Sequence, residues 1–160
     1  MIFTMNSQDL LEGLNTVTRA LSARSPKQIL EGILMTAAGD RVKMTCTDGS
    51  LVIECTNAAS IKEEGQAVLP GKLFTELIRK MPAGDVNISV TDNRTAVIRC
   101  MKNRSSLAIM NADEYPEIQN LQSGTMVKIP QNKLRDMISR VVFAIIEDRK
   151  SGSAGMPRPI

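Results

Sequence analysis

Hydrophobic and polar positions along the chain follow two periods, one typical of strands and one typical of helices. Residues 2–4 read as a strand, and apolar positions from Leu10 to Leu21 trace one face of a helix that Asn6 or Ser7 can cap and that reaches about Ser22. Three β-rich runs follow at 29–38, 41–47 and 50–58, separated by turn residues. This order predicts a strand, a helix and an antiparallel meander.

The same order then repeats. A strand at 65–70 precedes a helix at 71–81 and a second meander of three strands at 85–91, 95–101 and 105–111. A third start follows, with a strand-like run at 125–128 and a helix over 131–144. Aligning the helices pairs Leu11 with Phe74 and Leu134, at offsets of 63 (74 minus 11) and 60 (134 minus 74) residues. We interpret this as duplication, although α+β domains also alternate in this way by chance.

The repeats predict an α+β protein in which two copies of a β-α-β-β-β unit form one domain over residues 1–110, with helices packed on antiparallel sheets. Residues 111–124 are polar and turn-rich and are expected to be an interdomain linker held down by Tyr115 and Ile118. Residues 125–148 read as the start of an incomplete second domain. Residues 149–160 are rich in Gly, Ser, Pro and basic residues and predict a flexible tail.

Composition argues against metal, disulfide and cofactor sites. A chain of 160 residues with 42% hydrophobic content can fill a core without them. Cys46, Cys55 and Cys100 are odd in number and form no C-x-x-C pair, and the chain has no histidine. We therefore expect reduced, buried thiols, no metal site and no cofactor.

Enzymatic activity and membrane insertion are also not expected. The usual general base, histidine, is absent, and no G-x-S-x-G, Walker or G-x-G-x-x-G motif occurs. We therefore predict no catalytic residues. The amino terminus does not resemble a signal peptide, and no run of eighteen apolar residues occurs, so a cytoplasmic protein is expected.

Charge is distributed unevenly between helices and loops. The helix at 71–81 carries three cations against Glu76, and the helix at 131–144 carries three against Asp136, whereas acids gather in turns, strand edges and the linker. Two such helices side by side would offer phosphates a positive surface, although at a net charge of +3 ordinary solvated helix faces remain the alternative. With three Phe, one Tyr and no Trp, stacking on single strands is disfavoured.

Four segments resemble one family in order and spacing. Residues 3–35, 68–82, 103–118 and 129–148 are similar to the amino-terminal domain and second-domain start of the bacterial DNA polymerase III beta subunit, the β sliding clamp. The resemblance implies the DNA-clamp fold: three similar domains per chain, each a doubled strand-helix-meander, in a two-chain ring with helices lining a hole for duplex DNA. Helices that cross the phosphate backbone would let the ring slide without reading bases.

The resemblance also implies site residues. Arg24, after the first helix, and Lys72, at the start of the second, fall on positions where the family touches DNA, and Arg79 is a further candidate on the second helix. Lys102, Arg104 and Leu107 would supply this chain's half of the ring-closing interface. The family's pocket for polymerase and clamp-loader peptides lies in a part that this sequence does not contain.

The sequence thus predicts a truncated sliding clamp, a DNA-replication processivity factor of the DNA polymerase III holoenzyme that binds duplex DNA independently of sequence. The alternative is an interaction or regulatory fragment that caps intact clamps through the ring-closing edge of the first domain. An unrelated helix-and-sheet module is a third possibility, which a fold without an internal twofold would favour.

Overall fold

The computed structural model describes residues 1–21, 27–91, 94–116 and 127–151. The chain divides into two compact units, Met1–Ile118 and Gln119–Ile160, each described here by itself. The first unit contains, in order, β1 (Ile2–Asn6), α1 (Ser7–Val17), η1 (Thr18–Ala20), η2 (Gln28–Glu31), β2 (Gly32–Ala38), β3 (Arg41–Thr47), β4 (Val52–Ala58), β5 (Ser60–Glu63), β6 (Gly65–Pro70), α2 (Gly71–Arg79), β7 (Asp85–Thr91), β8 (Thr95–Cys100), β9 (Asn103–Ala108) and η3 (Ala112–Glu114).

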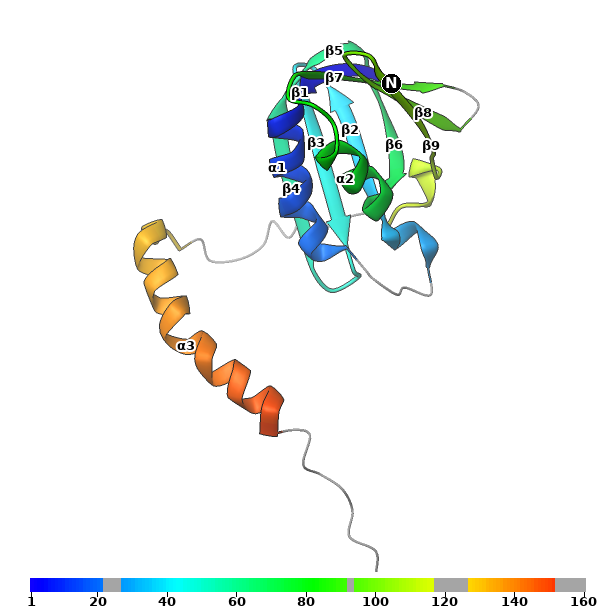
Figure 1. Ribbon diagram of the computed structural model, residues 1–160. Helices are drawn as coiled ribbons and strands as arrows, with labels where there is room; N and C mark the ends of the chain where they lie inside the picture. The colour runs from blue at the N-terminus through cyan, green and yellow to red at the C-terminus, as the bar shows by residue number, and fades with distance from the viewer. Residues whose placement is uncertain (22–26, 92–93, 117–126, 152–160) are drawn as a thin grey trace, which may run out of the picture. The chain divides into compact units, whose positions relative to one another are not determined.

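The strands form two antiparallel sheets in which the repeats exchange their first strands. The five-stranded sheet has the order β5-β1-β7-β8-β9, and the four-stranded sheet has the order β4-β3-β2-β6 (Figure 1). Strand β1 therefore pairs with β7 from the second repeat, while β6 pairs with β2 from the first. Each repeat supplies the strand that completes the other's sheet.

The register of the strands shows an internal twofold. Met5 lies opposite Val86 and Phe3 opposite Ile88, and in the second sheet Leu69 lies opposite Ile33 and Ala67 opposite Met35. The helices begin at Ser7 and Gly71, 64 residues apart (71 minus 7), and the leading strands β1 and β6 repeat at the same offset, whereas their partners on β2 and β7 repeat at an offset of 53 (86 minus 33). These pairs confirm the duplicated β-α-β-β-β unit. The alignment of Leu11 with Phe74 was wrong by one residue, because the fully buried positions that correspond are Leu10 and Phe74.

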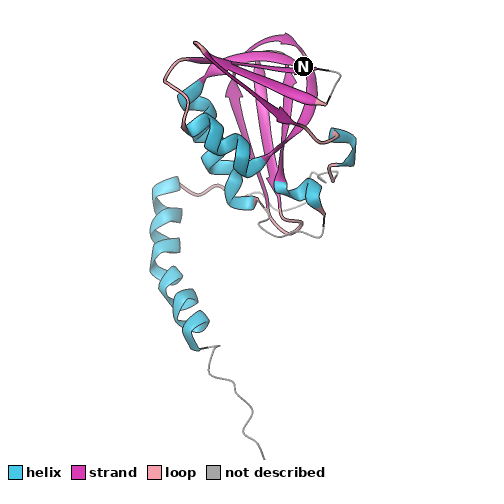
Figure 2. Cartoon of the chain, turned by 45° about the vertical axis from the view of Figure 1, so that its right-hand side comes forward, coloured by secondary structure: helices cyan, strands magenta, loops and turns pink. Residues whose placement is uncertain are grey.

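Both helices lie on the same side of the strands, where they cover the main core. Figures 1 and 2 show α1 and α2 side by side in two views, and the core between helices and sheets contains Phe3, Leu14 and Phe74, all fully buried. Helix α1 approaches β3 closely at Gly13, where an added Cβ would lie 2.2 Å from Met44 Cε. The glycine that weakens helix propensity therefore lets α1 approach β3 without displacing the Met44 methyl group. Asn6 caps α1, as predicted, by accepting a hydrogen bond from the Gln8 N–H at 2.8 Å.

A second, smaller cluster lies on the opposite face of the four-stranded sheet. It consists of Ile29, Leu30, Val68 and Tyr115, and successive residues of β6 alternate between the two clusters as strand geometry requires. The Tyr115 hydroxyl donates to the Thr45 carbonyl oxygen at 3.3 Å and is buried. This fixes the chain after β9 to the sheet, as the sequence predicted for Tyr115, whereas Ile118 lies outside the described residues.

Several local predictions differ from the structure, and the last meander strand, predicted at 105–111, is β9 at Asn103–Ala108. The first α-helix ends at Val17, and the chain continues as the 3₁₀ turn η1, so the predicted end near Ser22 was too late. Residues 28–31 form the 3₁₀ turn η2 instead of the start of a strand, because strand pairing with β6 begins only at Gly32. Strand β5, which pairs with β1, was missed because its sequence SIKE is short and mostly polar.

The described part of the second unit contains one helix, α3 (Gln131–Ser151). Residues 127–130 are not a strand, since the described residues of this unit include no second strand to pair with, and residues 125–126 lie outside them. The helix continues to Ser151, into the range predicted to be a flexible tail. Its large apolar side chains that the structure describes are exposed: Leu134, Met137, Ile138, Val141 and Val142.

No helix in the described ranges combines the length and the apolar character needed to cross a membrane.

Candidate nucleic-acid interface

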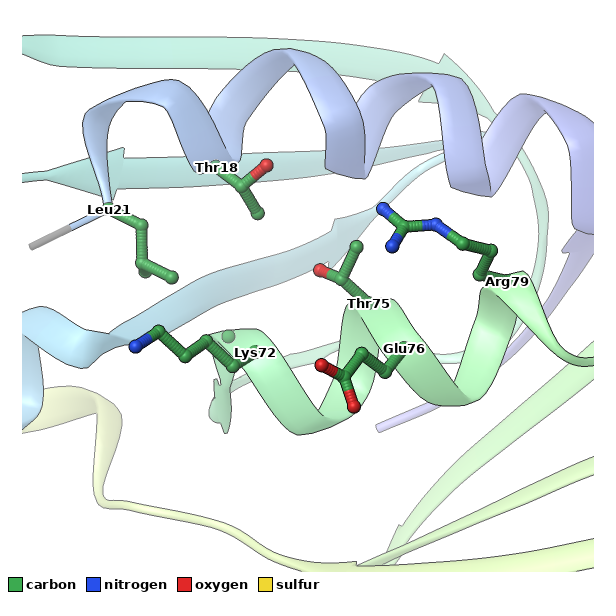
Figure 3. A pocket seen from close by; sticks show the side chains of 7 residues that line it. Thr18, Leu21, Lys72, Thr75, Glu76 and Arg79 are labelled. Atoms are coloured by element: carbon green, nitrogen blue, oxygen red, sulfur yellow. The ribbon is translucent and has the colours of Figure 1, made fainter. Parts of the chain in front are cut away.

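A groove of about 250 Å³ runs between α1 and α2 (Figure 3). Gly71, at the start of α2, lies against Leu21 after α1, and Arg79, at the end of α2, reaches Asn15 in α1, so the helices run antiparallel. The groove is lined from both helices and from the turn that follows α1, by Thr18, Leu21, Gly71, Lys72, Thr75, Glu76 and Arg79.

Lys72 lies at the entrance of this groove, in the first turn of α2. Helix α2 has Pro70 as its N-cap residue, and no side chain caps its first N–H groups. The positive end of the helix dipole and the Lys72 ammonium group therefore act at the same place. The Lys72 side chain is exposed, as a phosphate contact requires.

Arg79 lies at the other end of the groove and is tied to α1. Its Nη2 donates a hydrogen bond to Asn15 Oδ1 at 3.2 Å, and Figure 3 shows the guanidinium extending from α2 toward α1. Both side chains are exposed. This hydrogen bond occupies one of the five guanidinium N–H donors.

Glu76 is the acidic side chain of the groove. Among the described residues, none of the ion pairs involves Glu76, Lys72 or Arg79. The lining therefore carries two cations and one carboxylate that are not paired with one another.

The cations of this layer come mainly from α2 and from the turn after α1. Within α1 both charged residues, Asp9 and Glu12, are acidic, whereas Arg19 lies in η1 and is exposed. Arg24, the other DNA-contact residue suggested by the resemblance, lies outside the described residues. The structure thus brings Lys72 and Arg79 to one groove and leaves Arg24 undescribed.

The ring-interface candidates lie at the far edge of the five-stranded sheet. Lys102 is in the turn between β8 and β9, and Arg104 is on β9, directly opposite Arg99 on β8. All three cations are exposed, and β8 is the only neighbour of β9 among the described strands. Leu107 differs, because its side chain is half-buried and packs against the core.

The described residues contain no group of three or more His, Cys, Asp or Glu side chains placed to hold a metal ion. All three cysteines are free, with Cys46 and Cys100 buried and Cys55 half-buried.

The fold and this helical layer can be compared with known proteins. A family model described as "DNA polymerase III beta subunit, N-terminal domain" matches residues 1–119. The chain belongs to this family. The DNA polymerase III beta subunit family therefore accounts for the whole first unit, including the duplicated repeat and the α1–α2 layer.

Relatives and solved structures agree with this assignment. The chain is 31% identical over 153 residues to the beta sliding clamp of Bacillus subtilis (strain 168), which covers 91% of this chain and 40% of the relative. The crystal structure of the DNA polymerase sliding clamp from Bacillus subtilis matches with a TM-score of 0.83 and 30% identity, over 86% of this chain and 38% of that one. A putative DNA polymerase III beta subunit from Eubacterium rectale matches with a TM-score of 0.84 and 29% identity, over 89% and 39% of the two chains.

The chain thus spans about two fifths of the length of the sliding clamps it matches. The comparisons confirm the DNA-clamp fold in the α+β class. As a member of a sliding-clamp family, the chain is not an enzyme, as the sequence predicted.

Sequence reasoning missed three polar residues at this site: Thr18 and Thr75, which line the groove, and Asn15, which accepts a hydrogen bond from Arg79. Uncharged polar residues are common on helix surfaces and carry no periodic pattern of their own. Only the packing of α2 against α1 brings these three side chains to Lys72 and Arg79.

Proposed function

We propose that this chain acts as the first domain of a sliding clamp, the DNA-replication processivity factor of the DNA polymerase III holoenzyme, and binds duplex DNA independently of sequence. The observation that supports this proposal most directly is the shared groove of α1 and α2. There Lys72 and Arg79 are exposed and have no carboxylate partner among the described residues.

The proposed contact is electrostatic. Lysine and arginine side chains on a helix layer can pair with backbone phosphates of either strand, and such contacts carry no base information. Arg24 is proposed to add a third contact from the segment after η1. Affinity should then fall steeply with salt and vary little with sequence.

We further propose that the exposed edge of β9 closes a ring with another clamp subunit through Lys102, Arg104 and Leu107. The two arginines that face each other across β8 and β9 repel in isolation, so an acidic partner surface would stabilise them. Leu107, whose half-buried side chain packs against the core, would support β9 from beneath the interface.

We propose the following domain boundaries and further partners. Residues 1–110 would be the first clamp domain, 111–124 the linker and 125–148 the start of the second domain, with the exposed face of α3 covered by other parts of that domain. Polymerase III and the clamp loader would bind to the part of the full-length relatives that this chain does not match. The protein would act in the cytoplasm.

DNA binding tests the main proposal. We expect this chain to bind a mixed-sequence duplex weakly at low salt. The double variant Lys72→Ala, Arg79→Ala should bind it more weakly still, and the slope of log K against log salt should fall by about 0.9 for each lost contact. Fluorescence anisotropy with two unrelated duplexes measures both quantities.

Lys62→Ala, which removes an exposed cation from β5 outside the groove, is the matched control. Equal effects of Lys62→Ala and of the groove variants would contradict the assigned surface. A strong preference for one duplex would contradict sequence-independent binding.

A second candidate function uses the same β9 edge without DNA. Because β9 has an unpaired side among the described strands, the chain could cap an intact clamp and prevent its closure. A pull-down with a full-length sliding clamp tests this candidate, with Arg104→Glu expected to abolish capture. A chain that acts only through DNA would capture no clamp in the presence of nuclease.

A further inference from the structure

The floor of the groove contains a polar group without a partner. Thr75 is 7% exposed, and its Oγ1 is buried without a hydrogen-bond partner among the described residues. Figure 3 shows the Thr75 side chain pointing from α2 into the space beneath Thr18 and Arg79. A buried hydroxyl without a hydrogen-bond partner destabilises the free protein. A ligand acceptor that enters the groove would accept a hydrogen bond from this hydroxyl and remove the destabilisation.

Arg79 is held over the same space. The Asn15 amide oxygen accepts from one guanidinium nitrogen at 3.2 Å and so restrains a side chain that would otherwise move freely. A guanidinium fixed in this way keeps further N–H donors for a planar or tetrahedral oxyanion. Lys72 is exposed, so its side chain can shift to admit a ligand without a change in the backbone.

The charge of the groove indicates which oxyanion fits. Lys72 and Arg79 contribute two positive charges and Glu76 one negative charge, which leaves a net charge of +1 in the lining. A phosphodiester carries one negative charge, whereas inorganic phosphate or a terminal phosphate carries nearly two. The uncapped start of α2 adds a partial positive charge at the Lys72 end.

We propose that the groove between α1 and α2 seats one backbone phosphodiester of duplex DNA, with Thr75 as a hydrogen-bond donor, Lys72 and Arg79 as ionic contacts, and Asn15 as the residue that positions Arg79. This inference rests on the proposed function, to which it adds a defined phosphate position and two contributing residues, Thr75 and Asn15.

The test separates a hydroxyl contact from general surface charge. Thr75→Val keeps the shape and removes the hydroxyl, so the variant should melt at the same temperature as the unmodified chain or higher, yet bind duplex DNA about fivefold more weakly. Asn15→Ala should weaken binding by about threefold through Arg79, and should add little when combined with Arg79→Ala. Glu76→Gln should tighten binding.

Thr16→Val is the matched control, because Thr16 lies on α1 outside the groove lining and its hydroxyl donates to the Glu12 carbonyl oxygen. It should leave DNA affinity unchanged. Binding is measured by anisotropy at constant ionic strength, with inorganic phosphate added in a second series.

If Thr75→Val and Asn15→Ala bind DNA with unchanged affinity while Lys72→Ala binds it more weakly, the proposed phosphodiester position in the groove is wrong. The proposed DNA binding would still stand. Displacement of DNA by inorganic phosphate beyond the effect of sodium chloride at equal ionic strength would indicate a free-anion site and overturn the phosphodiester assignment. No binding by the unmodified chain would remove the proposed function itself.

Discussion

Cys46 is fully buried in the core of the first unit, and its ionisation is coupled to folding. Burial raises the pKa of the Cys46 thiol from 9.0 to about 12. Burial likewise raises the pKa of the Tyr115 hydroxyl, with the nearby Cys46 as a smaller cause. Both groups stay protonated in the native state at pH values where the unfolded chain releases their protons.

The expected consequence is a loss of stability in alkali. Below about pH 9 the Cys46 thiol is protonated in both the folded and the unfolded chain, so its ionisation does not lower the free energy of unfolding. As pH rises from about 9 toward 12, only the unfolded chain ionises, so the free energy of unfolding falls by up to about 1.4 kcal/mol per pH unit. Urea titrations between about pH 8 and 10 measure this slope. Cys46→Ala should lower stability at neutral pH but flatten the slope, and an unchanged slope would show that Cys46 is not its cause.

Met101 occupies an unfavourable backbone position in the turn between β8 and β9. Its φ is 50°, in the left-handed region, and its side chain is 74% exposed, so little packing offsets the strain. Met101→Gly should therefore stabilise the protein by about 1 kcal/mol. The urea midpoint measures the gain. Met101→Ala keeps the backbone cost and is the control, and equal midpoints for the two variants would contradict this explanation.

At the scale of elements, the position of α1 against the sheet depends on Gly13, which has no side chain. Gly13 lets α1 approach β3 and β4, where an added Cβ would lie 2.2 Å from Met44 Cε and 3.0 Å from Asn57 Oδ1. Gly13→Val should destabilise the first unit by about 1–3 kcal/mol, because Met44 is fully buried and cannot move into solvent.

Thermal denaturation measures this loss. Gly13→Ala is the graded control: its higher helix propensity partly offsets the smaller clash, so it should lie between glycine and valine. A valine variant as stable as the original chain would show that α1 can shift away from the sheet.

The elements themselves were largely predictable from sequence. Both helices and six meander strands follow from periodicity, because one face of each is buried and the burial pattern appears in the sequence. Strand β5 and the turn η2 were not predictable in this way, since SIKE pairs with the distant strand β1, and the apolar residues of QILE pack against Val68 and Tyr115. Charge and resemblance suggested Lys72 and Arg79, whereas Asn15 and Thr75 come close to them only when α1 and α2, which begin 64 residues apart, pack together.

The pairing of strands was also beyond sequence reasoning. A meander predicts hydrogen bonds between consecutive strands, but nothing local specifies whether β1 pairs within its own repeat or with β7. The exchange that the structure shows is a long-range outcome, set by both sheets closing around one core.

At the scale of the whole first unit, this exchange makes the two repeats one cooperative structure. A cut between Glu64 and Gly65, in the turn between β5 and β6, separates β1 from β7 and β2 from β6. We expect residues 1–64 and 65–118 to be largely unfolded when apart and to regain β-structure when mixed. Circular dichroism and heteronuclear NMR of one labelled half measure this recovery. A half that folds alone would contradict the mutual dependence.

The crossed first strands also bear on how such a protein could have begun. In this structure the leading strand of each β-α-β-β-β unit pairs with the meander of the other unit. Two identical copies could satisfy each other by trading those strands, as a symmetric homodimer does. Gene fusion would then have placed within one polypeptide a strand exchange that first took place between two molecules.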